Sequence, residues 1–136
     1  FKINSTLKSV YQNLEPGGLI CFDFIDANRF FLNIKGGKEI EHSATINTTR
    51  YQRRSVMTPS LTEDNFIFSW DSYYVEHQDD DIMPLINDYS KVRAFTKDEW
   101  LLLLELHNFK VLQFIDRTSY AFDTFVVIAQ KKDLSQ

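Results

Sequence analysis

A sharp break between a helical pattern and an apolar strand, at residues 14–25, constrains the fold of this chain more than any other feature. Apolar side chains recurring at spacings of three and four predict a helix over roughly residues 3–14. The sequence Glu15-Pro16-Gly17-Gly18 ends that helix, because proline cannot continue it and glycine tolerates positive φ. Leu19–Ile25 is then a nearly continuous apolar run, which is typical of a strand covered on both faces. The pattern predicts a central strand of an α/β sheet.

Size and charge limit the class of protein. The chain has 136 residues, enough for one core of ordinary size. Its formal net charge of −4 argues against a nucleic-acid partner, whose binding depends on Lys and Arg contacts to phosphate. No apolar run approaches the roughly 20 residues that a membrane span needs, so we expect no membrane partner. Cys21 is the single cysteine, which excludes an internal disulfide and fits a reducing, cytoplasmic setting.

The middle of the chain changes to extended segments rich in polar and aromatic residues, at 39–57, 66–77 and 82–95. Four aromatic residues fall on one face by the period-two alternation of a strand: Phe66, Phe68, Trp70 and Tyr74. We therefore predict a three-stranded antiparallel meander with one aromatic face. Asp79-Asp80-Asp81 between two of the segments is interpreted as a polar turn, and no metal site is expected.

The last part of the chain returns to the pattern of a helix and strands. Thr96-Lys97-Asp98-Glu99 is a capping box, which predicts that a helix starts at Lys97. Asn108 can adopt the left-handed conformation that closes it. Residues 109–116 and 125–132 predict two strands, and the short link between them indicates antiparallel pairing.

The order of these elements resembles the last third of class I S-adenosylmethionine-dependent methyltransferases. Leu14-Glu15-Pro16-Gly17-Gly18, followed by an apolar strand with Asp23 near its end, is similar to the family's segment before its fifth strand. Arg93-Ala94-Phe95-Thr96 and the later His107-Asn108-Phe109 are similar to its second recurring stretch, with Asn108 in place of the usual glycine. The resemblance spans residues 1–35 and 90–132.

This resemblance implies an α/β fold, a C-terminal remnant of a Rossmann-like methyltransferase sheet with its last three strands and two helices. Residues 1–38 and 96–136 would form that remnant, and 39–95 an inserted antiparallel β subdomain acting as an acceptor-side lid. The family's strand order implies that 19–25 pairs with 125–132, which pairs with 109–116. The other edge of 19–25 would then be covered by the preceding part of the same polypeptide, since Phe1 opens directly into a helical pattern.

The function implied by the resemblance is the transfer of a methyl group to a small-molecule acceptor. This chain would supply the acceptor side, and the N-terminal part of the same polypeptide would hold most of the S-adenosylmethionine. Gly17-Gly18 and Gly36-Gly37 do not have the spacing of a glycine-rich cofactor loop, so no cofactor-binding residue is expected here and the chain alone is expected to be inactive. A free-standing α+β ligand-binding or interaction module without catalysis is the alternative. A catalytically dead methyltransferase-like partner subunit is a third possibility.

Methyl transfer depends on positioning and needs no nucleophilic side chain, so the sequence assigns no catalytic residue. Open α/β sheets place ligands at the carboxyl ends of strands. This favours the polar residues at the end of the strand 19–25 and just after it as acceptor-binding groups. The alternative is that they cap the strand end and bond to the loop. An anionic acceptor could meet Arg50, Arg53 or Arg54, for which a solvated strand face is the simpler interpretation. The candidate substrate-binding residues are Asp23, Asp26, Asn28, Arg29, Trp70, Tyr74 and Arg93.

Overall fold

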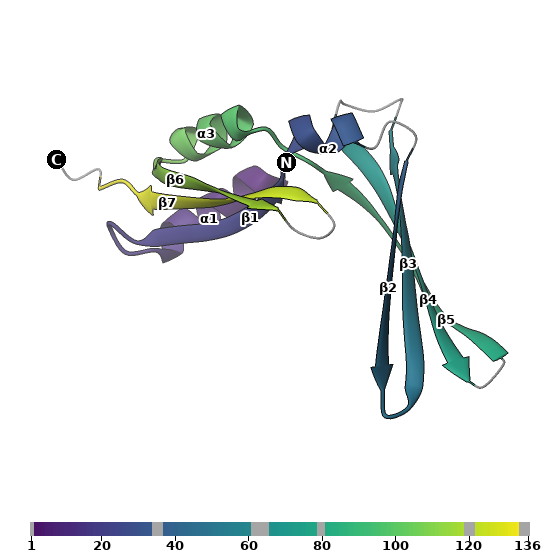
Figure 1. Cartoon of the computed structure of the whole chain (residues 1–136). Helices are drawn as coiled ribbons and strands as arrows, with labels where there is room; N and C mark the ends of the chain where they lie inside the picture. Colours follow the sequence, from purple (N-terminus) through teal and green to yellow (C-terminus); the bar gives the residue numbers. More distant parts are fainter. Residues whose placement is uncertain (1, 34–36, 61–65, 79–80, 119–121, 134–136) are drawn as a thin grey trace. The chain divides into compact units, whose positions relative to one another are not determined.

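The structure is a computed structural model that describes residues 2–33, 37–60, 66–78, 81–118 and 122–133 (Figure 1). The chain divides into two compact units, each described by itself below. Unit 1 comprises Phe1–Phe30 and Ala94–Gln136, and unit 2 comprises Phe31–Arg93. In chain order the elements are α1 (Lys2–Asn13), β1 (Leu19–Ile25), α2 (Ala27–Asn33), β2 (Lys38–Ile46), β3 (Thr49–Pro59), β4 (Ile67–Gln78), β5 (Asp81–Arg93), α3 (Lys97–Leu106), β6 (Phe109–Thr118) and β7 (Asp123–Lys131).

Unit 1 contains a three-stranded antiparallel sheet in the order β1-β7-β6. The predicted pairing of these three strands is confirmed. In the register, Val127 of β7 lies between Phe22 of β1 and Phe114 of β6, so these three side chains share one face.

That face carries the core of unit 1, because α1 and α3 both pack against it. Trp100 of α3 is its centre, with its ring centroid 4.6 Å from that of Phe22 and 4.9 Å from that of Phe95. Leu7 anchors α1 in the same cluster. Its buried members are Leu7, Phe24, Phe95, Trp100, Leu104, Phe109, Phe125, Val127 and Ala129.

The opposite face of the sheet differs from the prediction that β1 is covered on both sides. Leu19, Cys21 and Asp23 alternate with the core residues of β1 and are exposed, Leu19 at 56%. Among the described residues of unit 1, no helix packs on this face. β1 also lies at the edge of this sheet. On its other side the described residues provide no neighbouring strand, only a backbone bridge at its end, where the Phe95 N–H donates to the Ile25 carbonyl.

β6 contains one extra residue. Val111 pairs with Ala129 and Gln113 with Ile128, which leaves Leu112 between them without a partner residue in β7. Because of this bulge Val111 and Phe114, three positions apart, both pack against the core.

The local signals at the helix ends are confirmed. The Thr96 hydroxyl accepts a hydrogen bond from the Glu99 backbone N–H at 3.1 Å, and the Glu99 carboxylate accepts one from the Thr96 N–H at 2.9 Å. Asn108 has a φ of 60° after α3, as its left-handed tolerance predicts. Gly17 has a φ of 76° in the turn between α1 and β1.

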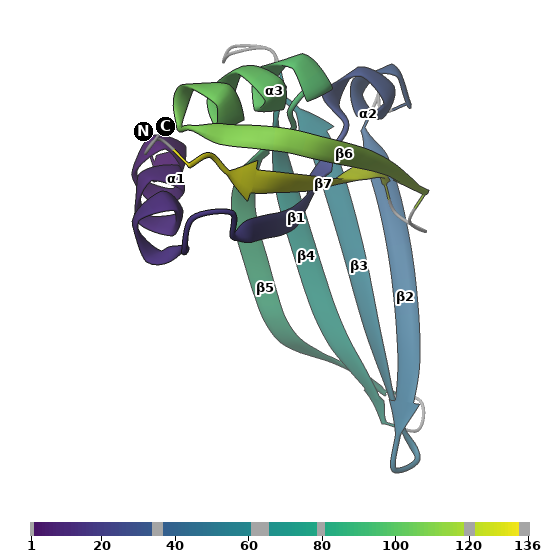
Figure 2. The same ribbon diagram turned by 90° about the vertical axis from the view of Figure 1, so that its left-hand side faces the viewer.

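Unit 2 contains a four-stranded antiparallel sheet in the order β2-β3-β4-β5, whose strands follow one another side by side in Figure 2. The predicted three-stranded meander was therefore wrong by one strand. The segment 39–57 reverses direction at Asn47-Thr48, where φ is 47° and 74°. Positive φ at both central residues defines the two-residue hairpin turn that matches strand twist. Asn-Gly is the usual signal for this turn, and Thr48 in place of glycine hid it.

The two edge strands of this sheet differ in character. β2 carries charged side chains such as Lys38, Glu39 and Glu41, which is a common protection of sheet edges. β5 is exposed along nearly its whole length, with large apolar side chains among the most exposed. These are Ile82 (63%), Met83 (48%), Leu85 (49%), Ile86 (64%) and Tyr89 (59%).

Candidate functional site

The candidate site of unit 1 lies where β1 ends and α2 begins. The Asp26 N–H donates to the Asp123 carbonyl at 3.0 Å, and the Ala27 N–H donates to the Phe95 carbonyl at 3.0 Å. The Asp26 carbonyl then accepts the first helical bond, from the Phe30 N–H. α2 was not predicted, and it places Asn28 and Arg29 in the first turn of a helix. The chain is thus held on both sides as it leaves the sheet.

Arg29 is the centre of the site because three carboxylates surround its guanidinium. Its Nε donates to Asp26 Oδ2 at 2.6 Å, and its Nη1 lies 3.0 Å from Asp116 Oδ1 and 3.9 Å from Asp123 Oδ1. Burial alone would lower the pKa of Arg29, but the hydrogen bonds and charges of Asp26 and Asp116 outweigh it, and the pKa is raised. The guanidinium therefore stays charged and fixes the relative positions of β1, β6 and β7.

An aromatic ring accepts two cations at the same site. The guanidinium carbon of Arg29 lies 4.4 Å from the ring centroid of Phe125, and Lys97 Nζ lies 3.9 Å from it. Both distances are within the range of cation–π attraction. Lys97 is the first residue of α3 and directly follows the Thr96 N-cap.

These groups line an open pocket of about 390 Å³ at the carboxyl end of β1. Its size is that of a small-molecule site. It presents carboxylates, two cations and an aromatic ring, an arrangement suited to orienting a polar ligand. The lining residues are Asp26, Asn28, Arg29, Lys97, Asp98, Asp116 and Phe125.

The structure brings together three of the seven candidate substrate-binding residues in this pocket: Asp26, Asn28 and Arg29. Asp23 is not among the lining residues and lies on the exposed face of β1. Sequence reasoning missed Lys97, Asp98, Asp116 and Phe125. The antiparallel pairing of β6 and β7 was a usable signal for two of them, because it places Asp116 opposite Phe125.

The other three candidates belong to unit 2. Trp70 and Tyr74 are both on β4 and share one face of the sheet by alternation. Arg93 ends β5 opposite Ile67, next to the pair of Phe68 with Val92, so its side chain is on the other face. The structure therefore separates Arg93 from the two aromatic residues.

The described residues contain neither a candidate metal site nor a membrane-spanning helix. No group of three His, Cys, Asp or Glu side chains there could hold a metal ion. Asp79 and Asp80, interpreted above as part of a turn, lie outside the described residues. No helix in the described part of the chain has the length and apolar character to cross a membrane.

Comparison with solved structures identifies the class of fold. No family model and no curated protein sequence matches the chain. It is similar to an S-adenosylmethionine-dependent methyltransferase from Clostridium acetobutylicum, with a TM-score of 0.67 and 11% identity over 96% of this chain and 51% of that one. At such low identity the similarity shows the fold alone. The chain has the fold of about half of a methyltransferase of this kind.

Two further solved structures have similar TM-scores. One is an amino pentose methyltransferase from Micromonospora echinaspora, involved in calicheamicin biosynthesis, with a TM-score of 0.67 and 12% identity over 95% of this chain and 50% of that one. The other is a sugar N-methyltransferase from a Streptoalloteichus species, with a TM-score of 0.65 and 10% identity over 96% of this chain and 49% of that one. Each match includes most of unit 2 as well as unit 1. The chain spans about half the length of each of these structures.

Proposed function

We propose that this chain is part of an S-adenosylmethionine-dependent methyltransferase that transfers a methyl group to a small-molecule acceptor. The fold similarity over 96% of the chain supports this most directly, because it extends through both units rather than a single common motif. A cytoplasmic location, suggested by the single cysteine, is part of the same proposal.

The chain supplies the acceptor side of the site in this proposal. The pocket around Arg29 supports this role, since it lies at the strand end where α/β sheets bind ligands. The residues present do not fit the cofactor. Gly17 and Gly18 are used in the turn before β1, where their N–H groups donate to the Lys131 and Glu15 carbonyls. The preceding part of the same polypeptide would therefore hold most of the S-adenosylmethionine.

Amino sugars are the first acceptors to test, because two of the similar structures are a methyltransferase of an amino pentose and a sugar N-methyltransferase. An amine acceptor must reach the methyl donor with a free lone pair and lose a proton after transfer. Asp98, an exposed carboxylate in the pocket, is available for hydrogen bonding to a protonated amine before that step.

The test compares this chain with the longer polypeptide that contains it. We expect calorimetry to show saturable binding of S-adenosylmethionine by the longer polypeptide and none by the 136 residues alone. Mass spectrometry of amino sugars incubated with the longer polypeptide and the cofactor should detect methylated product. Binding of the cofactor by the 136-residue chain would refute the division of roles. A longer polypeptide that binds no cofactor would support the ligand-binding module instead.

A further inference from the structure

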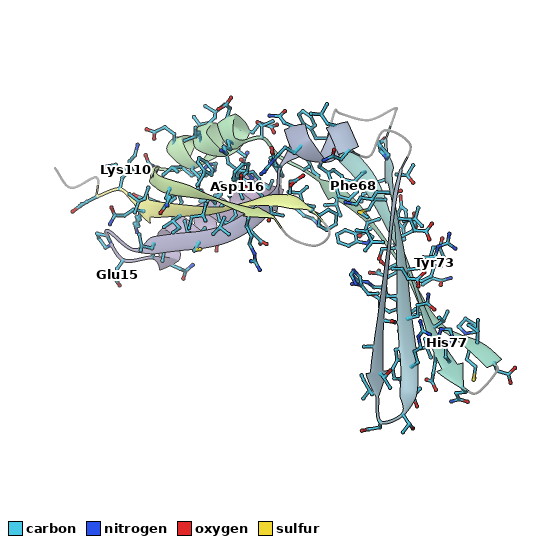
Figure 3. All side chains as sticks on the ribbon, in the orientation of Figure 1. Glu15, Phe68, Tyr73, His77, Lys110 and Asp116 are labelled. Carbon is cyan, nitrogen blue, oxygen red and sulfur yellow. The ribbon has the colours of Figure 1, made fainter. Side chains whose placement is uncertain are left out.

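The two faces of the unit 2 sheet differ in whether their charged side chains have hydrogen-bond partners. Figure 3 shows Tyr73 and His77 on one side of the sheet and Phe68 on the other. On the Tyr73 face, polar groups bond to one another: Arg54 Nη2 donates to Glu39 Oε2 at 2.8 Å, and His77 Nε2 lies 2.7 Å from Gln52 Oε1. Arg54 and His77 on this face therefore already have polar partners within the sheet.

The opposite face, here called the Trp70 face, includes Arg53 of β3 with Trp70 and Tyr74 of β4. Arg53 has no charged partner there among the described residues. Arg53 is on β3, with His42 of β2 and Tyr74 of β4 as its cross-strand neighbours. Its Nε is buried and has no hydrogen-bond partner. Among the described residues its guanidinium makes no ion pair.

The carboxylates nearest in register do not neutralise Arg53. Glu76 and Asp88 point to the same face by alternation, from β4 and β5. The Glu76 carboxylate accepts a hydrogen bond from Gln78 instead, and neither acid lies within ion-pair distance of Arg53 in the described structure.

The surroundings of Arg53 also suit a ligand with a flat or apolar part. Tyr74 lies directly opposite Arg53, and Met57 pairs with Trp70 four residues further along the same face, with Met57 fully buried. The Ser55 and Ser72 hydroxyls, which lie between these two pairs, bond to each other at 2.9 Å and so have no need of a partner from a ligand. A half-buried guanidinium that lies opposite the Tyr74 ring and makes no ion pair with a described residue is complementary to an anion on a small organic molecule.

We propose that Arg53 binds the anionic group of a small organic molecule, a carboxylate or phosphate, on the Trp70 face. Three arginines were candidates from the sequence, and Arg53 is the one on the Trp70 face. Arg54 and Arg50 are on the Tyr73 face, where Arg54 is paired with Glu39. Identifying this ligand as the methyl acceptor rests on the proposed function. The anion site itself rests only on unit 2.

The experiment measures binding of phenyl phosphate by calorimetry to the longest polypeptide that contains this chain, without cofactor. Phenyl β-glucoside, which has the ring but no charge, is the comparison probe. Phenyl phosphate should bind saturably, and Arg53→Gln should weaken it at least about tenfold. Arg54→Gln, the adjacent arginine on the other face, is the matched control and should change it less than about twofold.

Arg53→Lys keeps the charge without the planar fork of donors and should lie between wild type and Arg53→Gln. Equal weakening by Arg53→Gln and Arg54→Gln would overturn the proposal, and so would phenyl β-glucoside binding as tightly as phenyl phosphate. Unchanged thermal unfolding of each variant separates lost binding from lost folding. Because no cofactor is present, a negative result leaves the methyltransferase proposal standing, and absent methyl transfer leaves the anion site standing.

Discussion

The buried residue Asp26 connects the end of β1 to three neighbours: Arg29, β7 and α2. Asp26 is 5% exposed, and its side chain accepts from Arg29 while its backbone N–H and carbonyl bond to β7 and α2. A buried carboxylate is costly unless it is paired and hydrogen-bonded. The pairing with Arg29 offsets that cost and keeps the mouth of the pocket in one conformation.

Replacing Asp26 by alanine should lower the free energy of unfolding by about 1–3 kcal/mol, because Arg29 loses its closest partner in a half-buried position. Asp23→Ala is the matched control. Its side chain is exposed on β1, the strand that ends just before Asp26, and its effect should stay within about 0.5 kcal/mol. Urea unfolding measures both, and equal effects would show that the Asp26–Arg29 contact does not stabilise unit 1.

The Glu39–Arg54 pair makes a prediction about pH. Hydrogen bonds from Arg54 lower the pKa of Glu39 below its ordinary value. The stability from this pair is therefore present above the ordinary glutamate range and is lost as pH falls through the lowered pKa. NMR titration of the Glu39 carboxyl carbon should show the lowered midpoint, and Arg54→Gln should raise it. Arg53→Gln, on the other face, should leave it unchanged; a shift of similar size there would mean that the pairing is not specific.

At the scale of elements, the sequence was sufficient where the signal was local. The capping box at Thr96 and the Pro16-Gly17 break each depend on a few adjacent residues, and both were predicted. α2 was not, because its seven residues carry too few apolar positions to show a period and its start depends on bonds to Phe95 and Asp123. The pocket could be predicted only in part for the same reason. Asp116 bonds to Arg29 from another strand, 87 residues away in the sequence, and periodic patterns predict only contacts between nearby residues.

The hairpin turn between β2 and β3 is strained by its second residue. Thr48 has a φ of 74°, which is unfavourable for a β-branched side chain. Thr48→Gly should therefore raise the free energy of unfolding by roughly 0.5–1 kcal/mol, since the relieved strain exceeds the added flexibility of the unfolded chain. Thr49→Gly, within β3, should instead lower it. Thermal unfolding of the two variants checks this, and destabilisation by both would show that Thr48 is not strained.

At the scale of the whole molecule, two surfaces expose apolar side chains or an unpaired strand edge, which a monomeric protein usually avoids. In unit 1, among the described residues, the face that carries Leu19 has no helix, and the edge of β1 before the Phe95 bridge has no partner strand. In unit 2 the edge strand β5 exposes a run of apolar side chains. Unpaired apolar edges promote association with other strands. The sequence predicts an open edge at β1 but not the apolar edge at β5, because exposure depends on the position of a strand in its sheet.

The isolated 136-residue chain should therefore self-associate at micromolar concentrations. Ile86→Lys, which places a charge on the β5 edge, should shift the distribution toward the monomer, while Ile40→Val in β2 should not. Sedimentation velocity over a concentration series measures this. A chain that stays monomeric throughout would count against an uncovered edge and favour a self-contained module.

The extra residue in β6 has a consequence for how this sheet tolerates insertions and deletions. Without Leu112, Val111 and Phe114 would be separated by one residue and would still face the same side, so a deletion there only restores regular pairing. The same loss within β7, which is paired on both sides, would exchange the two faces for every later residue and move the later core side chains to the surface. Related proteins can thus differ in length at Leu112 and keep this core, whereas β7 must keep its length.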